Sequence, residues 1–237
     1  MSLALLNHNP ITLDKLVIDS KSILSASEST NKILKDLSGG LGGVSLELYK
    51  IIDLRMLSGL VGELFVSELS KSTPYLEKNP WIDGYPDLLN IATSEALREF
   101  QHASNEVYLN FPFGGIEVKN TFGVKKTGIN FQDRETRFAR TETNRSWKIQ
   151  KTLVWKAHHR ETNNLIALHS DYVDKIPQII GVFFSDELDP EDWSIKQQPK
   201  EGSTMTSFSA TKPSAFSKLK KRVIALDSRF KYDEFLQ

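Results

Sequence analysis

The middle of the chain reads Gly115-Ile116-Glu117-Val118-Lys119, a short run in which apolar and charged side chains alternate. Alternation at every second residue is typical of a β-strand with one face against a core. Ile116 and Val118 would then point into the core, while Glu117 and Lys119 would share the opposite face. A carboxylate and an ammonium beside a packed sheet are costly to desolvate, so we expect these two charges to have a chemical role.

Other short, β-rich runs surround this strand, which we extend to Phe113–Lys119. They are Leu153–Ala157, Leu165–Leu168 and Ile179–Phe184. The last run is apolar on both faces, which is typical of a central strand covered on two sides. The sequence therefore predicts a sheet with layers on both of its faces.

Two helices are expected before the Gly115–Lys119 strand. In Tyr49–Leu69, apolar residues recur every three to four positions, which predicts a helix with one buried stripe that ends at Ser72-Thr73-Pro74. Ser94 can cap a second helix that runs to about Tyr108. Helices outside and strands inside predict an α/β fold, a mixed central sheet flanked by helices.

We expect a single domain in three parts. Residues 1–75 would be a helical N-terminal part, and residues 76–195 the core that carries the chemistry. Residues 196–237 are rich in Ser, Thr and Lys until Val223–Leu226 becomes apolar again, and they are interpreted as a loop or a mobile tail.

Composition narrows the function classes. The 237 residues are 39% hydrophobic and 25% charged, which is ordinary for a globular protein. Without cysteine, disulfides and thiolate metal sites are excluded. No apolar run is long enough to span a membrane, and no phosphate-binding GxxxxGK[ST] or GxGxxG motif occurs, so neither a membrane role nor a nucleotide cofactor is expected. A cytoplasmic location in a bacterial or archaeal cell is the working expectation.

The formal net charge is zero, but the charges are segregated along the chain. Residues 121–160 carry ten Lys and Arg against three acids, and residues 196–222 carry seven against one. Residues 161–195, which lie between them, carry eight acids against one lysine. Such sorting can give a neutral protein one basic face for a polyanion, although alternating solvated surface is the simpler alternative.

The chemistry that we expect centres on Glu117, Lys119 and Asp87, which lies in the segment Tyr85-Pro86-Asp87. Two carboxylates, together with the main-chain carbonyl of Val118, suit a hard cation such as Mg²⁺. A bound Mg²⁺ would activate a water and stabilise charge on a phosphate, and Lys119 would orient that water, help to deprotonate it or offset the charge.

Pro86-Asp87 and Glu117-Val118-Lys119, each found once in the chain, resemble the motif of the PD-(D/E)xK nuclease superfamily, and of type II restriction endonucleases within it. The resemblance implies a restriction-endonuclease-like core with the motif acids on adjacent strands. It also implies Mg²⁺-dependent hydrolysis of double-stranded DNA that leaves 5′-phosphate ends. A glutamate on a preceding helix often reaches the metal in this family, and Glu63 matches that position, with an exposed helix charge as the alternative.

The spacing departs from the family pattern. Twenty-nine residues, expected to include a helix, separate Asp87 from Glu117, which is wide for the family. Asp83 lies on the same turn-rich segment and is the alternative second carboxylate. His158, His159 and His169 are interpreted as structural or as occasional phosphate contacts, because no metal-ligand spacing accompanies them.

DNA contacts, mostly to phosphates, are expected after the Glu117–Lys119 strand, and residues 196–237, if they form a loop, would add further contacts. The candidates are Asn120, Thr121, Lys125, Lys126, Arg134, Arg137, Arg140 and Arg145. Cutting both strands of a palindromic site would need a two-fold homodimer, which we expect. Two alternatives stay open: a repair or recombination nuclease of the same fold, and a DNA-binding module that no longer cuts.

Overall fold

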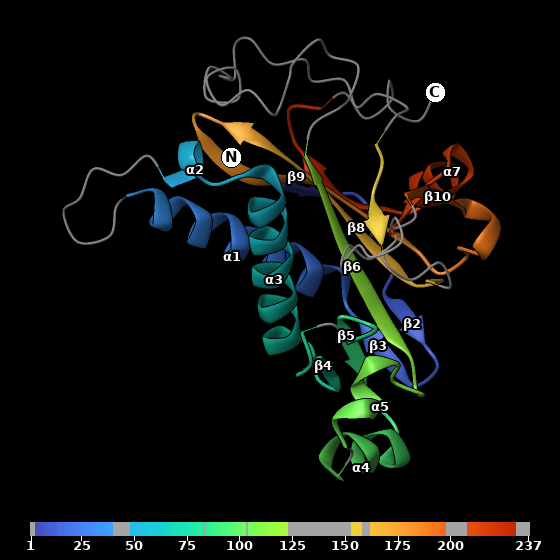
Figure 1. Cartoon of the computed structure of the whole chain (residues 1–237). Coiled ribbons are helices and arrows are strands. Elements are labelled where there is room, and N and C mark those ends of the chain that lie inside the picture. The colour runs from blue at the N-terminus through green and yellow to red at the C-terminus, as the bar shows by residue number, and fades with distance from the viewer. Residues whose placement is uncertain are drawn as a thin grey trace, which may run out of the picture.

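The computed structural model describes residues 3–39, 48–82, 84–102, 104–122, 153–157, 162–197 and 208–230. Its centre is a seven-stranded sheet (Figure 1). The strands in spatial order are β1 (Leu3–Leu5), β12 (Val223–Asp227), β9 (Ile176–Ser185), β8 (Leu165–Val173), β6 (Gly115–Phe122), β5 (Leu88–Asn90) and β4 (Leu76–Lys78). The β6–β8 pair is parallel and the other pairs are antiparallel, so the predicted mixed sheet is confirmed.

Two long helices cover one face of this sheet, α1 (Ser20–Ser38) and α3 (Leu54–Ser72) (Figure 1). The fully buried side chains of α3, among them Leu57, Val61 and Phe65, pack with Val118 of β6. The predicted helix Tyr49–Leu69 is interrupted, because the Asp53 carboxylate accepts from the first backbone N–H groups of α3 and caps it. The short α2 (Leu48–Ile51) precedes this cap.

The opposite face is covered in two places. Over β8 and β9 lie α7 (Pro213–Lys221) and a small sheet of β10 (Trp193–Gln197), β11 (Phe208–Thr211) and β7 (Lys156–Ala157). Trp155 anchors this layer: its ring centroid is 5.8 Å from that of Phe183, and its Nε1 donates to the Leu168 carbonyl over 2.8 Å. Next to β5, α4 (Ser94–His102) and α5 (Asn105–Leu109) supply a separate apolar cluster around Leu89 (Figure 1).

Ile179–Phe184 is the interior of β9, between β12 and β8, so the predicted central strand is confirmed. Ile179, Val182 and Phe184 pack towards α1 and α3, while Ile180 and Phe183 pack towards the layer of α7. Covering on both sides explains why neither face of this strand is polar.

Several predicted boundaries were wrong. The helix expected from Ser94 to Tyr108 is two helices, α4 and α5, with Ser104 at the N-cap position of the second. Residues 1–75 are not wholly helical: β1 joins the main sheet, and β2 (Ile11–Leu13) pairs with β3 (Leu16–Ile18). Leu153–Ala157 is a strand only at its end, β7.

The C-terminal part is integral to the fold where it is described. Instead of a loop or tail, residues 208–227 form β11, α7 and β12, and β12 lies between β1 and β9 in the main sheet. Within the described ranges, no helix combines the length and apolar character needed to cross a bilayer.

Candidate active site

The pairing of β5 with β6 brings Asp87 to Glu117. Leu88 is paired with Ile116 in the antiparallel register, so Asp87, immediately before β5, lies opposite Glu117. Ile116 and Val118 point into the core, and Glu117 and Lys119 share the other face, as the alternation predicts. In the parallel register, Glu117 and Lys119 lie beside Leu165 and Ala167 of β8, and neighbouring residues in a sheet point to the same face. Leu165 and Ala167 pack in the same apolar cluster as α7, so Glu117 and Lys119 lie on the face of the sheet that α7 covers.

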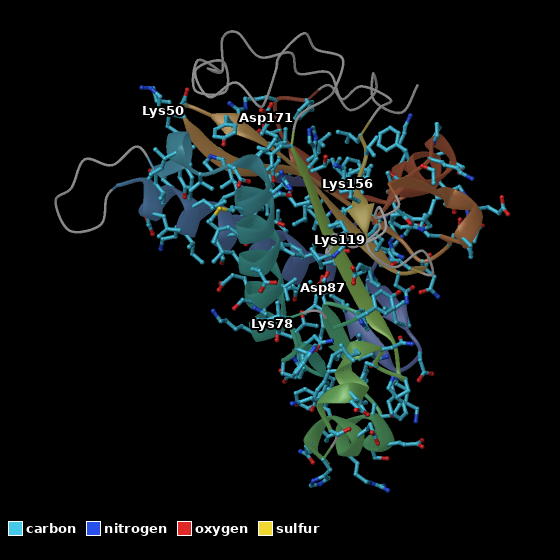
Figure 2. The ribbon with its side chains drawn as sticks, viewed as in Figure 1. Lys50, Lys78, Asp87, Lys119, Lys156 and Asp171 are labelled. Carbon is cyan, nitrogen blue, oxygen red and sulfur yellow. The ribbon has the colours of Figure 1, made fainter. Side chains whose placement is uncertain are left out.

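The three side chains are in direct contact. Lys119 Nζ is 2.6 Å from Glu117 Oε1 and 3.3 Å from Asp87 Oδ2. The backbone N–H of Val118 donates to Asp87 Oδ2 over 2.8 Å, and the backbone N–H of Asp87 donates to Glu117 Oε2 over 3.3 Å. Figure 2 shows Asp87 and Lys119 beside one another along β6. The structure therefore joins residues that are 32 positions apart in the sequence.

Burial is uneven across this cluster of Asp87, Glu117 and Lys119, which we call the carboxylate–lysine site. The Glu117 side chain is 4% exposed, that of Lys119 21% and that of Asp87 27%. Glu117 is thus the buried member of the site, while Asp87 and Lys119 are partly exposed to solvent.

The site holds two carboxylates but one lysine, and burial, together with this imbalance, shifts the pKa values of Glu117 and Lys119. Burial, and next the charge of Asp87, raise the pKa of Glu117 to about 7, although Lys119 acts in the opposite direction. Burial alone would lower the pKa of Lys119, but Asp87 and Glu117 more than offset this and raise its pKa above the ordinary value. With both acids ionised, the site carries one net negative charge in a poorly solvated place. An added cation would relieve that charge.

The donor set fits Mg²⁺. Asp87 and Glu117 supply two carboxylates, and the Val118 carbonyl is a third oxygen. A strand residue presents its N–H and C=O to the same side, and the Val118 N–H is directed at Asp87, so its carbonyl faces the same side. In the described part of the chain, no group of three or more His, Asp or Glu is arranged to hold a metal. Two carboxylates with waters are nevertheless a common protein contribution to Mg²⁺.

Glu63 is placed elsewhere. Its carboxylate forms an ion pair with Lys78 of β4, with Oε2 and Nζ 2.5 Å apart, and its side chain is 63% exposed. Glu63 lies on α3, which packs against the other face of the sheet, through Val61 and Phe65. Among the contacts of the described residues, none joins Glu63 to the carboxylate–lysine site.

The two predicted DNA contacts on β6 face opposite ways. Asn120 lies on the α3 side, where Ser58 Oγ donates to its backbone carbonyl over 3.1 Å. In its side chain, Nδ2 donates to Ser58 Oγ over 3.4 Å and Oδ1 accepts from Ser170 Oγ over 2.7 Å. Its amide is therefore engaged in tying α3 and β8 to β6. Thr121 shares the face of Lys119 and is half-buried, so it lies in line with the site.

The other predicted DNA contacts, the alternative carboxylate and two of the histidines lie outside the described residues. These are Lys125, Lys126, Arg134, Arg137, Arg140 and Arg145, together with Asp83, His158 and His159. His169 is buried in β8, level with Thr121 of β6.

Gly115 is a residue of the site that the sequence reasoning missed. Its φ of 153° is one that side chains disfavour, and a Cβ there would lie 1.9 Å from the Leu88 carbonyl oxygen. Only glycine allows β5 to approach β6 this closely, and that approach sets Asp87 against Glu117. The pair Gly114-Gly115 immediately before the charged strand was the available signal.

No protein-family model matches the chain, and no curated protein or solved structure matches it either. Functional inference therefore depends on the chemistry of the residues and on how the fold arranges them.

Proposed function

We propose that this protein is a Mg²⁺-dependent endodeoxyribonuclease of the PD-(D/E)xK type, with a restriction-endonuclease-like core. The observation that carries the proposal is the contact of Asp87, Glu117 and Lys119 across two adjacent strands, with Glu117 buried and the other two side chains partly exposed. Two acids here share one lysine and leave an excess negative charge, and burial raises the pKa of Glu117, so this charge is poorly compensated.

Asp87, Glu117 and the Val118 carbonyl would hold Mg²⁺. When bound, this ion lowers the pKa of a water and stabilises the charge that develops on the phosphate. Lys119 keeps its proton between two carboxylates, so its ammonium orients the attacking water and offsets phosphate charge, and it does not serve as the base. Attack of water on phosphorus breaks the bond to the 3′-oxygen, which leaves with a proton as a 3′-hydroxyl, and the other product carries the 5′-phosphate.

Double-stranded DNA is the proposed substrate. In the sequence, the basic block, residues 121–160, begins at the last two residues of β6, just after Lys119. Basic residues beside a phosphodiester-cleaving site would neutralise flanking phosphates. Recognition of a short palindrome by a homodimer, as in a type II restriction enzyme, is the specific form that we propose.

The decisive experiment is incubation with plasmid and phage DNA, with Mg²⁺ or with EDTA. Wild type is compared with Asp87→Asn, Glu117→Gln and Lys119→Met, and with the control Glu187→Gln. Glu187 is an exposed carboxylate that pairs with Lys221 over 2.9 Å, so it matches Glu117 in chemistry but not in position. We expect discrete Mg²⁺-dependent fragments from wild type and the control, and none from the three site variants.

The alternatives give different outcomes in the same assay. Cleavage only of branched or flapped DNA would indicate a repair or recombination nuclease of the same fold. Retarded DNA without cleavage under any metal would indicate a binding module. Full cleavage by Glu117→Gln would refute the proposed site.

A further inference from the structure

We propose that Asn79 is a positioning residue for the carboxylate–lysine site, one that fixes the backbone of Pro86 and Asp87 so that the Asp87 carboxylate faces Glu117. The catalytic meaning of this role rests on the proposed nuclease function. The contacts themselves do not, and they can be tested separately.

Asn79 follows β4 and is 7% exposed. Its backbone N–H donates to the Asp87 carbonyl over 2.9 Å. Its side-chain Nδ2 donates to the carbonyls of Pro86, over 3.0 Å, and Tyr108, over 2.9 Å. Its Oδ1 accepts from the backbone N–H of Trp81 over 2.9 Å. One buried side chain thus binds three backbone groups, one of them in the peptide link immediately before Asp87.

These bonds are needed because Asp87 lies just outside the sheet ladder. Leu88, the first residue of β5, is paired with Ile116 of β6 on one side and with Lys78 of β4 on the other, and Asp87 comes immediately before it. Asp87 is held from the β6 side by the Val118 N–H and from the β4 side by Asn79. If the hydrogen bonds from Asn79 were lost, the Pro86–Asp87 backbone would no longer be fixed on the β4 side. The Asp87 carboxylate would then be held less firmly in its orientation towards Glu117.

Asparagine is the side chain that this place requires. Two carbonyl oxygens and one N–H converge on it, and an amide offers two donors and one acceptor. Aspartate has the same shape but would set an oxygen against the two carbonyls. Gly84 provides the room, since a Cβ there would lie 2.4 Å from Asn79 Nδ2.

Asn31 offers a matched control for a purely structural role. Its Nδ2 donates to the Ile179 carbonyl over 2.9 Å, and its Oδ1 accepts from the Ile179 N–H over 2.7 Å. It therefore ties α1 to β9 as Asn79 ties the Pro86 segment, but it does not touch the site. A change in site properties seen with Asn79 and absent with Asn31 cannot come from a general loss of stability.

The first measurement is amide hydrogen exchange at Val118, whose N–H donates to the Asp87 carboxylate. We compare wild type, Asn79→Ala, the milder Asn79→Ser and Asn31→Ala, all without metal, and use the Ile166 amide on β8 as the internal reference. We expect Val118 exchange to rise roughly fivefold or more relative to Ile166 in both Asn79 variants, as loss of one hydrogen bond implies. In Asn31→Ala the ratio should stay at the wild-type value.

The second measurement is Mn²⁺ affinity by calorimetry, with kcat and KM for DNA cleavage. We expect both Asn79 variants to bind Mn²⁺ about tenfold more weakly and to lose kcat more than KM, with Asn31→Ala unchanged in both. Wild-type Val118 exchange and Mn²⁺ affinity in Asn79→Ser would overturn the proposal. If wild type neither binds Mn²⁺ nor cuts DNA, the nuclease function fails, and the exchange ratios still decide whether Asn79 holds Asp87.

Discussion

Among the described residues, two clusters each place two carboxylates around one lysine, and their surroundings give them opposite character. In the carboxylate–lysine site, Lys119 lies between Glu117 and Asp87. In the second cluster, Lys218 Nζ on α7 is 2.6 Å from Asp192 Oδ2 and 2.8 Å from Asp189 Oδ2. Similar residues at similar distances therefore need not have the same role.

In the second cluster, the turn that carries the two acids also supplies hydrogen bonds to their carboxylates. Asp189 and Asp192 form a capping box for the short 3₁₀ helix Pro190–Asp192, so each carboxylate also accepts a backbone N–H. Burial alone would raise the pKa of Asp192, but hydrogen bonds from Lys218, Ser214 and the Asp189 backbone lower it. A hydrogen bond from Lys218 likewise lowers the pKa of Asp189. These acids are stabilised in their charged form and need no further cation.

Glu117 has less support, and this difference is what points to a ligand. Within the described part of the chain, its carboxylate accepts from Lys119 and, over 3.3 Å, from the backbone N–H of Asp87. Its pKa is raised where those of Asp189 and Asp192 are lowered. A buried carboxylate without enough donors is a typical feature of a functional site, whereas one held by a capping box is a typical structural feature.

The largest expected difference between the clusters is in catalysis. Glu117→Gln should lower kcat for DNA cleavage by roughly 10³-fold, because the transition-state charge loses several kcal/mol of stabilisation through the metal. Asp192→Asn should lower the melting temperature and leave kcat of the folded enzyme unchanged. Single-turnover cleavage and thermal melts on both variants test this, and equal losses of kcat would erase the distinction.

Metal should stabilise one cluster and not the other. At a Mn²⁺ concentration about 100 times the Kd, binding adds about 2.7 kcal/mol to the free energy of unfolding. For a chain of this size, that raises the melting temperature by roughly 5–10 °C. The increase should vanish in Glu117→Gln and persist in Asp192→Asn. A shift that survives in Glu117→Gln would place the metal elsewhere.

The clusters should also have opposite dependence on pH. The pKa of Glu117 is about 7 in the folded protein against an ordinary 4.5. Between pH 4.5 and 7, Glu117 therefore keeps its proton in the folded protein and has lost it in the unfolded protein. The stability of metal-free protein should therefore fall as pH rises from about 4.5 to 7, by at most roughly 3 kcal/mol, and level off above.

The lowered pKa of Asp192 has the reverse effect. Its contribution to stability is present above the ordinary pKa of 3.8 and is lost as pH falls through the lower folded pKa. Urea unfolding in EDTA from pH 3 to 8 separates the two contributions. Glu117→Gln should remove the decline towards pH 7, and Asp192→Asn should alter only the acid side.

The sequence could predict the β6 face because strand alternation is local. Ile116 and Val118 alternate with Glu117 and Lys119, and this pattern alone assigns their faces. Pro86-Asp87 could be matched to them only by resemblance, because pairing across a 29-residue gap is not encoded in any local pattern. Asn79 and Gly115 were missed for the same reason: their roles arise from backbone groups of Pro86, Tyr108 and Leu88 that approach through the fold.

Boundary errors have a physical origin as well. The predicted helix from Tyr49 to Leu69 follows apolar periodicity, yet the carboxylate of Asp53 caps the N-terminus of α3 and interrupts it. Met56 falls within the same apolar spacing, yet it is 65% exposed, and the buried stripe is centred on Leu57, Val61 and Phe65. The apolar run Val223–Leu226 was not assigned to a strand, because its place in the sheet comes from pairing with β1 and β9, which lie far from it in the sequence.

The smallest expected effect concerns Glu63, where the resemblance and the structure suggest different roles. A glutamate that reached the metal would contribute strongly to cleavage, but Glu63 pairs with Lys78 at the surface, with side chains 63% and 43% exposed. Exposed ion pairs contribute about 0–1 kcal/mol. Glu63→Gln should therefore change stability by less than about 1 kcal/mol and leave kcat within roughly threefold of wild type. Parallel assays of Glu63→Gln and Lys78→Met provide the check, because breaking a surface pair from either side should have the same small effect. A loss of cleavage confined to Glu63→Gln would show instead that this carboxylate leaves Lys78 and joins Asp87 and Glu117 when metal binds.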